Sequence, residues 1–271
     1  VDKIAGLDNF CWPDPIESEK TPDGKFKLAQ LVRANRELER VCRAYRLPCV
    51  SGKDSMKNDY GKGENKISIP PTLLFSLFGD HPDVRYTTTS DLKDHGERLY
   101  LVGTSHDELG ASEISFMLRE ENDSIGIGGN VPKLENPQNN LSTYRALSKS
   151  IRSGLVKTSH DCSEGGVAVA IAEMCIGGRI GAIIDIDGTG DDSLWARLWG
   201  ESLGRFIVGV KPENEQDWLK SMSGHTITYL GETTQQENLV IRDGFDEIID
   251  LNVLDMVNSW QNTLDMTGGG K

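Results

Sequence analysis

The chain of 271 residues lacks the marks of a membrane protein or a nucleic-acid-binding protein. No apolar run approaches the roughly 20 residues that a membrane-spanning helix needs, and charges at Asp2 and Lys3 predict no signal peptide. Positive charge is scarce: 29 Lys and Arg stand against 42 Asp and Glu, a formal net charge of -13. Phosphate backbones are bound by clustered Lys and Arg, so no nucleic-acid partner is expected. A nucleotide ligand stays open, because a few local donors and a divalent cation suffice to bind it.

Cysteine is also sparse, and its spacing excludes two classes of small protein. The five cysteines form no CxxC pair, and their number is odd. A disulfide framework or a structural zinc site is therefore not expected. We interpret them as reduced thiols of a cytoplasmic protein, mostly in the core. They are Cys11, Cys42, Cys49, Cys162 and Cys175.

The front of the chain reads as an incomplete domain. Residues 1–24 are rich in Pro, Asp and Trp and are expected to be irregular. Apolar residues at helical spacing predict a helix over 26–45. A short strand at 49–51 and a strand over 67–78, placed at an edge by Pro70 and Pro71, follow it. One helix with a few strands is thin for a domain, and polar residues 80–96 mark the boundary.

The rest of the chain alternates strands and helices, without an internal repeat. This alternation favours an α+β fold with α/β layers. We predict two domains, residues 1–88 and residues 89–271. Strands are expected at 98–103, 182–186, 206–210 and 226–230, and helices at 109–118, 141–151, 167–176, 193–199, 213–222 and 253–264.

The segment VSGKDSM is the first candidate for phosphate chemistry. It lies where the strand is expected to pass into a loop, and Gly52 would let the backbone approach a ligand closely. Lys53 could pair with phosphate, Asp54 could bind magnesium, and Ser55 offers a hydroxyl group. The alternative is an ordinary turn with solvated charges, because the Walker pattern GxxxxGK[ST] is absent.

The segment TSHDCSEGG is the second candidate. Asp161 and Glu164 are hard oxygen donors suited to Mg²⁺, which takes one or two carboxylates plus substrate phosphates. Ser163 and the free N–H groups of the following helix could bind phosphate oxygens. The alternative makes Ser163 a helix cap and Asp161 a solvated turn residue. His160 is interpreted as a structural histidine rather than a base.

Two further segments are weaker candidates. LDNFCWPDP brings Asp8 and an aromatic residue into a non-helical stretch, which could contact a nucleotide or simply be an anchored surface loop. In ESLGRF, Glu201 and Arg205 could form a structural ion pair or touch a ligand, and we prefer the structural role. No candidate nucleophile can be paired with a base from the sequence, so no catalytic residue is assigned.

Taken in chain order, LDNFCWPDP, VSGKDSM, TSHDCSEGG and ESLGRF resemble the C-terminal half of the synthase region of the phosphoribosylformylglycinamidine synthase family. That family belongs to the aminoimidazole ribonucleotide synthetase superfamily. The resemblance implies that residues 1–88 are the rear part of a second N-terminal synthetase-like domain and that residues 89–271 are the C-terminal synthetase-like domain. It also implies ATP-dependent conversion of formylglycinamide ribonucleotide to the amidine in purine biosynthesis, a ligase reaction with glutamine as the nitrogen donor.

The resemblance also implies a set of site residues and partners. Its nucleotide and substrate contacts match Gly52, Ser55 and Ser163, and another falls close to Asp8. Its magnesium ligand matches Asp161, whereas Lys53 as a nucleotide contact and Asp54 as a metal ligand remain candidates from their own chemistry. The ligands would be ATP or ADP with Mg²⁺. Partners would be the remaining synthase half and a glutaminase, and an exposed sheet edge could also drive homodimerisation. The isolated chain is expected to be inactive, because the family's catalytic histidines belong to the other half.

Two alternatives remain at this stage. The chain could be a scaffold half that binds a structural nucleotide or only mediates domain association. It could instead be a kinase-like relative such as thiamine-monophosphate kinase, which is disfavoured because those enzymes carry their nucleotide motif in a front segment that is not seen here.

Overall fold

The computed structural model describes residues 3–61, 65–121, 129–191 and 193–263, and the chain divides into two compact units. The first unit comprises Val1–Val84 and Pro137–Leu141. The second comprises Arg85–Asn136 and Ser142–Lys271. Within the described residues, no helix has the length and apolar character that crossing a membrane requires.

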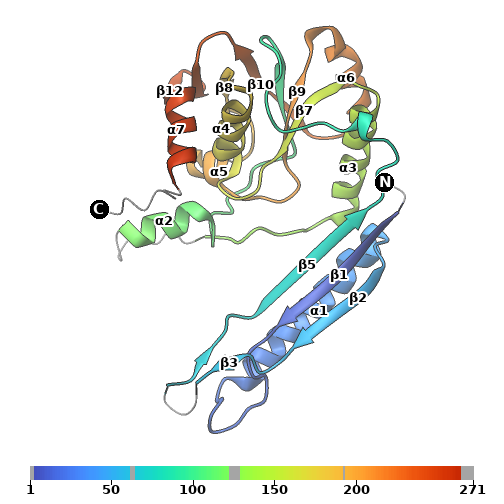
Figure 1. Cartoon of the computed structure of the whole chain (residues 1–271), viewed down its shortest axis with the longest axis vertical. Coiled ribbons are helices and arrows are strands. Elements are labelled where there is room, and N and C mark those ends of the chain that lie inside the picture. Colours follow the sequence, from blue (N-terminus) through green and yellow to red (C-terminus); the bar gives the residue numbers. More distant parts are fainter. Residues whose placement is uncertain (1–2, 62–64, 122–128, 192, 264–271) are drawn as a thin grey trace. The chain divides into compact units, whose positions relative to one another are not determined.

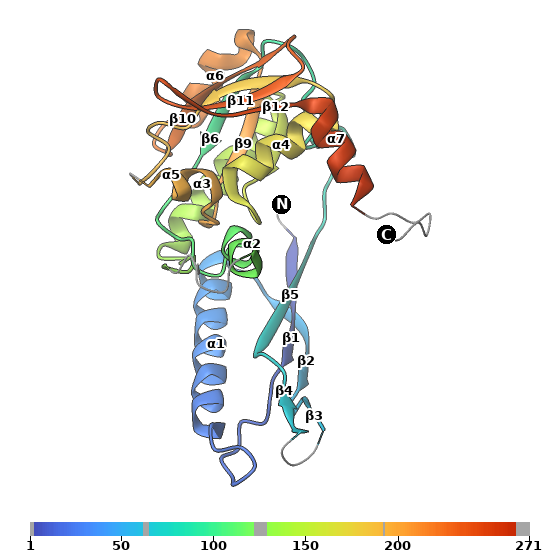
Figure 2. The same cartoon turned by 90° about the vertical axis from the view of Figure 1, so that its left-hand side faces the viewer.

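The first unit is a small sheet accompanied by one long helix. The order of its three main strands is β2-β1-β5, in which β1 and β2 are parallel and β5 is antiparallel to β1. The helix α1 connects the two parallel strands and lies along the sheet (Figure 2). The elements are β1 (Ile4–Cys11), α1 (Gly24–Tyr45), β2 (Cys49–Ser55), β3 (Asp59–Tyr60), β4 (Ile67–Ser68) and β5 (Thr72–Gly79), with β3 and β4 paired separately.

The end of α1 is fixed by backbone geometry. Arg46 adopts a left-handed conformation with φ of 53°, and the N–H of Leu47 donates to the carbonyl of Cys42 at 2.8 Å. The N–H of Arg46 donates to the carbonyl of Arg43 at 3.2 Å. These two bonds form a Schellman-type ending, which satisfies the last carbonyl groups of the helix.

Three expectations for this unit were wrong. Residues 4–11 form strand β1 rather than an irregular segment, because they pair along both edges, with β2 and with β5. Strand β2 does not end at residue 51, since its pairing with β1 keeps residues 52–55 extended. Residues 67–78 do not form a single strand, because Pro70 and Pro71 have no donor for the ladder and separate β4 from β5. The expected edge position is confirmed for β5.

The second unit is built on a seven-stranded sheet of order β12-β11-β8-β10-β6-β9-β7. Strands β8 and β11 are parallel, and the other neighbouring pairs are antiparallel. Short 3-10 turns are η2 (Val84–Tyr86), at the junction of the two units, and η3 (Pro212–Asn214). The strands are β6 (Arg98–Val102), β7 (Val156–Asp161), β8 (Gly181–Asp185), β9 (Phe206–Val210), β10 (Ile227–Thr234), β11 (Asn238–Asp243) and β12 (Asp246–Asn252). The helices are α2 (Glu113–Glu121), α3 (Pro137–Arg152, whose first five residues belong to the first unit), α4 (Gly166–Gly178), α5 (Leu194–Trp199), α6 (Glu215–Ser221) and α7 (Val253–Asn262).

Helices cover both faces of this sheet (Figure 1). One core cluster joins Leu99 and Leu101 of β6 to α4, α5 and α7. The other joins Tyr100 and Val102 of the same strand to α3 and α6. Alternate residues of β6 therefore serve opposite cores, as the two-residue period of a strand requires. The α+β fold class with α/β layers is confirmed.

Some elements of this unit differ from the sequence-based expectation. The helix expected over 109–118 begins only at Glu113, because Ala111 adopts a left-handed conformation with φ of 60° and breaks the helical path. The hairpin β11–β12 was not predicted. The last helix ends at Asn262, and its expected extension to residue 264 lies outside the described residues.

Candidate functional site

In the first unit, strand pairing brings Asp8 against Gly52. The two residues are register partners on β1 and β2. A Cβ atom at position 52 would lie only 2.6 Å from Oδ1 of Asp8, so only glycine leaves room for this carboxylate. The glycine therefore does permit a close approach here, but the group that approaches is Asp8.

The strand geometry divides the remaining predicted residues between two faces. Asp54 follows Gly52 by two positions and shares its face, whereas Lys53 and Ser55 lie on the opposite face. The face of Asp8 is the one toward α1: Asp8 and residues of α1, including Leu38, line a hollow of about 570 Å³. The structure thus brings Asp8, Gly52 and Asp54 together and separates them from the other two.

In the second unit, the segment from β7 into α4 forms one wall of a cavity of about 610 Å³. Asp161 is the last residue of β7, and the hydroxyl of Ser163 donates to its Oδ2 at 2.5 Å. Ser163 does not cap the helix, because Gly165 occupies the N-cap position with φ of 75°. The cavity is lined by Pro132, Tyr144, Asp161, Cys162, Ser163, Glu164, Glu201, Leu203, Gly204, Arg205 and Phe206.

His160 has the structural contacts that were expected of it. Its Nε2 lies 3.1 Å from Oε2 of Glu173, and its Nδ1 lies 2.7 Å from the backbone carbonyl of Asp161. Both ring nitrogens therefore have partners within the protein.

Glu201 and Arg205 both line the cavity, and the side chain of each forms hydrogen bonds with backbone groups. Oε1 of Glu201 accepts from the N–H of Gly165 at 3.0 Å and from the N–H of Glu113 at 2.9 Å. One carboxylate oxygen thereby connects the beginnings of α4 and α2. This supports the preferred structural role, and the negative charge of Glu201 also favours the charged form of Arg205.

The guanidinium of Arg205 is almost completely buried, with 1% of the residue exposed. It donates to the hydroxyl of Ser105 at 2.7 Å, to the carbonyl of Ser202 at 2.9 Å and to the carbonyl of Gly200. Burial lowers the pKa of Arg205 from its ordinary value. The side chain therefore places a buried, hydrogen-bonded positive charge at the cavity wall.

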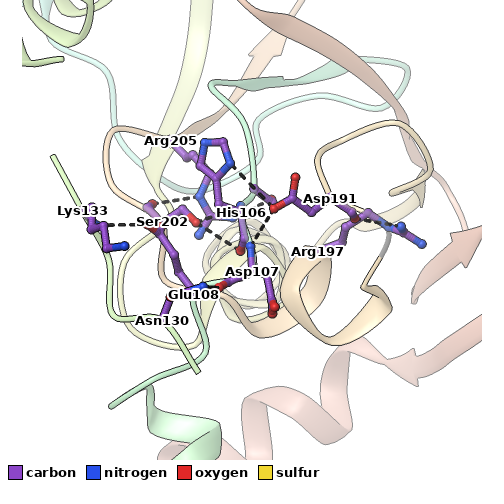
Figure 3. Close-up of polar contacts among 10 residues, drawn as sticks. His106, Asp107, Glu108, Asn130, Lys133, Asp191, Arg197, Ser202 and Arg205 are labelled. Carbon is purple, nitrogen blue, oxygen red and sulfur yellow. Dashed lines mark hydrogen bonds and ion pairs between the residues drawn. The ribbon is translucent and has the colours of Figure 1, made fainter. Parts of the chain in front are cut away.

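The loop after β6, which the sequence analysis missed, does not line the cavity but hydrogen-bonds to Ser202 and to the cavity residue Arg205. The N–H of His106 donates to the hydroxyl of Ser202 at 3.0 Å, and the N–H of Lys133 donates to Oε1 of Glu108 at 3.0 Å (Figure 3). Glu108 is 7% exposed, and its Oε2 has no hydrogen-bond partner among the described residues. A short signal could have revealed this loop: Thr-Ser-His-Asp occurs at residues 104–107 and again at 158–161.

The two Thr-Ser-His-Asp segments lie toward the same end of two strands that flank β9. Strands β6 and β7 both pair antiparallel with β9, so they run in the same direction on either side of it. Val102 and Asp161 both have Phe206 as their register partner. The cavity is therefore placed at the end of three adjacent strands, where backbone groups leave the sheet.

The oxygen, nitrogen and sulfur donors of the described side chains indicate whether the protein could bind a metal ion. Across residues 3–61, 65–121, 129–191 and 193–263, no group of three or more His, Cys, Asp or Glu side chains is arranged to hold a metal ion. Asp161 and Ser163 still offer hard oxygen donors at the cavity, which fits a magnesium ion that takes its other ligands from water and phosphate. Asp54 belongs to the first unit and is not among the residues that line this cavity.

Comparison with known proteins assigns the class of the second unit. The sequence model of the AIR synthase related protein C-terminal domain family matches residues 94–244, and the chain therefore belongs to this family. Over 270 residues the chain is 31% identical to the phosphoribosylformylglycinamidine synthase subunit PurL of Deinococcus radiodurans. This match covers 96% of the chain but only 34% of that subunit, so the chain spans about a third of the curated relative's length. The resemblance stated from the sequence motifs is confirmed.

Solved structures share the fold across both units. Thermotoga maritima PurL complexed with FGAR superposes with a TM-score of 0.65 at 16% identity, covering 93% of this chain and 39% of that one. The same Thermotoga protein complexed with ATP gives a TM-score of 0.59 at 16% identity, covering 93% and 37%. The hydrogenase maturation protein HypE of Escherichia coli gives 0.62 at 12% identity, covering 92% and 72%.

Proposed function

We propose that this chain is part of a phosphoribosylformylglycinamidine synthase, the ligase that uses ATP to convert formylglycinamide ribonucleotide to the amidine in purine biosynthesis. The observation that carries the proposal is the 31% identity to a synthase subunit, sustained over 96% of the chain. Glutamine would be the ultimate nitrogen donor, and the protein would work in the cytoplasm. A purely scaffolding role is less well supported, because the likeness includes the segments that line the cavity.

The cavity of the second unit is the proposed nucleotide site. Ser163 would contact phosphate oxygens, and Asp161 would bind Mg²⁺ together with those oxygens. The magnesium would neutralise phosphate charge in a site that is otherwise acidic. Arg205 would add a fixed positive charge at the wall, held by its three hydrogen bonds.

The first unit is proposed to contribute the second group of ligand contacts. Lys53 and Ser55 share the sheet face opposite α1, and Gly52, Asp8 and Asp54 lie on the other face. We propose that both groups serve ATP, ADP or substrate, with Asp54 as a second candidate metal ligand.

The proposed partners are the remaining synthase half and a glutaminase domain or subunit. The face of the first sheet opposite α1 exposes apolar side chains, with Leu74 at 59% and Phe78 at 56% exposure. Exposed apolar residues gathered on one sheet face are typical of a surface that another protein covers. A second copy of the chain would be the alternative occupant of this face.

Exchange of segments tests the enzymatic role. The third of the Deinococcus radiodurans subunit that this chain matches is replaced by residues 1–271, and the chimera is assayed for amidine formation with ammonia and ATP. Activity above that of the subunit lacking this third supports the proposal. A chimera that is soluble and melts cooperatively, yet makes no amidine, contradicts it.

Nucleotide binding by the chain itself is tested separately by thermal unfolding with Mg-ADP. Ligand at 100 times its dissociation constant adds about 2.7 kcal/mol to the free energy of unfolding. Ser163→Ala and Asp161→Asn should reduce the shift, whereas Ser153→Ala, an exposed serine outside the cavity, should not. Binding without rescue of activity in the chimera would favour the scaffold that holds a structural nucleotide.

A further inference from the structure

Two of the five cysteines lie in contact in the first unit. The Sγ atoms of Cys42 and Cys49 are 3.8 Å apart. Cys42 is in the last turn of α1 and is partly buried, and Cys49 is the first residue of β2 and is exposed. Nothing in the proposed synthase chemistry uses either thiol.

Backbone hydrogen bonds hold the two thiols in this position. The carbonyl of Cys42 accepts from Leu47, which turns the chain back from the helix. The carbonyl of Pro48 accepts from the N–H of Gly6 at 2.9 Å, and Cys49 is the register partner of Gly6. Each cysteine is therefore fixed by its own element, and the two sulfur atoms face each other across the six-residue connection.

We propose that Cys42 and Cys49 form a dithiol site that is reversibly oxidised to a disulfide by peroxide or by a low-molecular-weight disulfide. A disulfide requires the sulfur atoms to approach to about 2.05 Å from their present separation of 3.8 Å. The inference stands on the geometry of the first unit and does not depend on the proposed synthase function.

The exposed thiol reacts first. With peroxide, the thiolate of Cys49 attacks one oxygen, the O–O bond breaks, and water leaves behind a sulfenic acid at Cys49. The thiol of Cys42 then attacks that sulfur, gives up its proton, and a second water leaves as the S–S bond forms. Two thiols and one peroxide thus give one disulfide and two waters. A thiol such as glutathione restores the pair by exchange.

The order of attack follows from the surroundings of the two thiols. Burial, followed by the hydrogen bond with Cys49, raises the pKa of the Cys42 thiol to about 11, which keeps it protonated and slows its own attack on peroxide. The other thiols are poor competitors. Burial raises the pKa of Cys162 and of Cys175 to about 12, and Cys11 donates to Oδ1 of Asn9 at 3.6 Å.

Oxidation at this site would act on Asp8. Cys42, Cys49 and Asp8 all line the same hollow of about 570 Å³ between α1 and the sheet. A disulfide would fasten the end of α1 to the start of β2 and restrict this hollow. It would thereby fix the surroundings of the carboxylate that packs against Gly52.

To test this, the reduced full chain is treated with oxidised glutathione or hydrogen peroxide. Its remaining thiols are then blocked, and the protein is digested with trypsin. Cleavage after Arg40, Arg43, Arg46 and Lys53 places the two cysteines in separate peptides, residues 41–43 and 47–53. A disulfide then appears as one linked species that reduction separates. Because a neighbouring thiol has a high effective concentration, the linked species should exceed glutathione adducts of Cys49 by about tenfold.

Three variants make the outcome decisive. In Cys42→Ser, Cys49 should accumulate as the glutathione adduct, and in Cys49→Ser, Cys42 should stay reduced. Cys11→Ser should leave the linkage unchanged. Equal glutathione adduct at Cys49 in the wild type and in Cys42→Ser, or linkage of Cys49 between two copies on a non-reducing gel, would overturn the proposal. Because the wild type is measured directly, a variant that fails to fold does not decide the result.

Discussion

The two units of this chain bury their apolar residues to very different extents. The second unit holds both clusters of buried hydrophobic residues found in the described part of the chain, one on each face of its sheet. The first unit buries Phe10 and Trp12, yet leaves Leu74, Leu77 and Phe78 of a single strand more than half exposed. A unit that exposes this much apolar surface gains less free energy from its own folding. The first unit therefore leaves apolar side chains of β5 uncovered in the isolated chain, whereas the second buries apolar residues against both faces of its sheet.

The largest expected effect is a matched truncation of leucine in the two units. Leu99 in β6 is 0% exposed and Leu74 in β5 is 59% exposed. Leu99→Ala should lower the free energy of unfolding by about 2–5 kcal/mol, because it removes buried methyl groups and leaves a cavity. Leu74→Ala should change it by no more than about 0.5 kcal/mol in the isolated chain. Denaturant unfolding of both variants checks this prediction. Equal losses of stability would contradict the difference in burial between the two units.

Ion pairs provide the next contrast. Arg197 donates two hydrogen bonds to the carboxylate of Asp243 in the second unit, where its side chain is 9% exposed. Asp243→Asn should cost about 3 kcal/mol, because it leaves a buried guanidinium without its counter-charge. On α1, Arg43 and Glu39 form an exposed pair, and Glu39→Gln should cost at most about 0.5 kcal/mol. Thermal melts at two salt concentrations measure both, and a larger loss for Glu39→Gln would contradict the prediction.

The contact between Asp8 and Gly52 tests tight packing within the first unit. Gly52→Ala should destabilise by about 1–3 kcal/mol, since the added Cβ forces the Asp8 carboxylate to move. The double variant Asp8→Ala with Gly52→Ala should recover most of this loss. Denaturant titration of the four members of the cycle gives the coupling energy. Additive losses would show that the two residues do not interact.

The smallest effect concerns a carboxyl group that the second unit buries. Glu97 is 1% exposed, and burial, followed by the charge of Asp94, raises its pKa; the backbone amide of Lys93 offsets this only in part. The folded state therefore keeps its proton at pH values where the unfolded state has lost it, so stability falls as pH rises from the ordinary glutamate pKa toward the raised one.

Replacing that carboxyl by an amide removes the pH-dependent loss. Glu97→Gln should stabilise the chain above the raised pKa by about 1.4 kcal/mol for each unit of pKa shift, and should have little effect below the ordinary pKa. Melting temperatures of the two proteins across the acidic to neutral range provide the measurement. A variant that is less stable than the wild type at neutral pH would refute this account.

The sequence predicted an element correctly where that element has a clear periodicity or composition of its own. The apolar spacing from Leu28 to Tyr45 predicted α1, and the Ala-rich run after Gly166 predicted α4. Strand β1 was missed because Asp8 and Asn9 are weak strand formers that only pairing along both edges keeps extended. The hairpin of β11 and β12 had a signal, since Gly244 follows Asp243 at the turn with φ of 63°.

The candidate site was predictable residue by residue but not as an arrangement. Asp161 and Ser163 were singled out from their local motif, and they do line a cavity. Glu108 was missed because its partner, the N–H of Lys133, lies 25 residues away. The separation of Lys53 from Asp54 follows from β2 continuing to Ser55, which pairing with β1 decides and local sequence does not.

The single oxygen of Glu201 that accepts from both Gly165 and Glu113 makes two distant loops share one fixed point. Glutamine can still accept both bonds, whereas aspartate is one methylene too short to reach them, so size matters more than charge at this position. The N–H groups of Glu113 and Gly165 thereby share one acceptor, so a shift of that oxygen alters the hydrogen bonds at the starts of both helices.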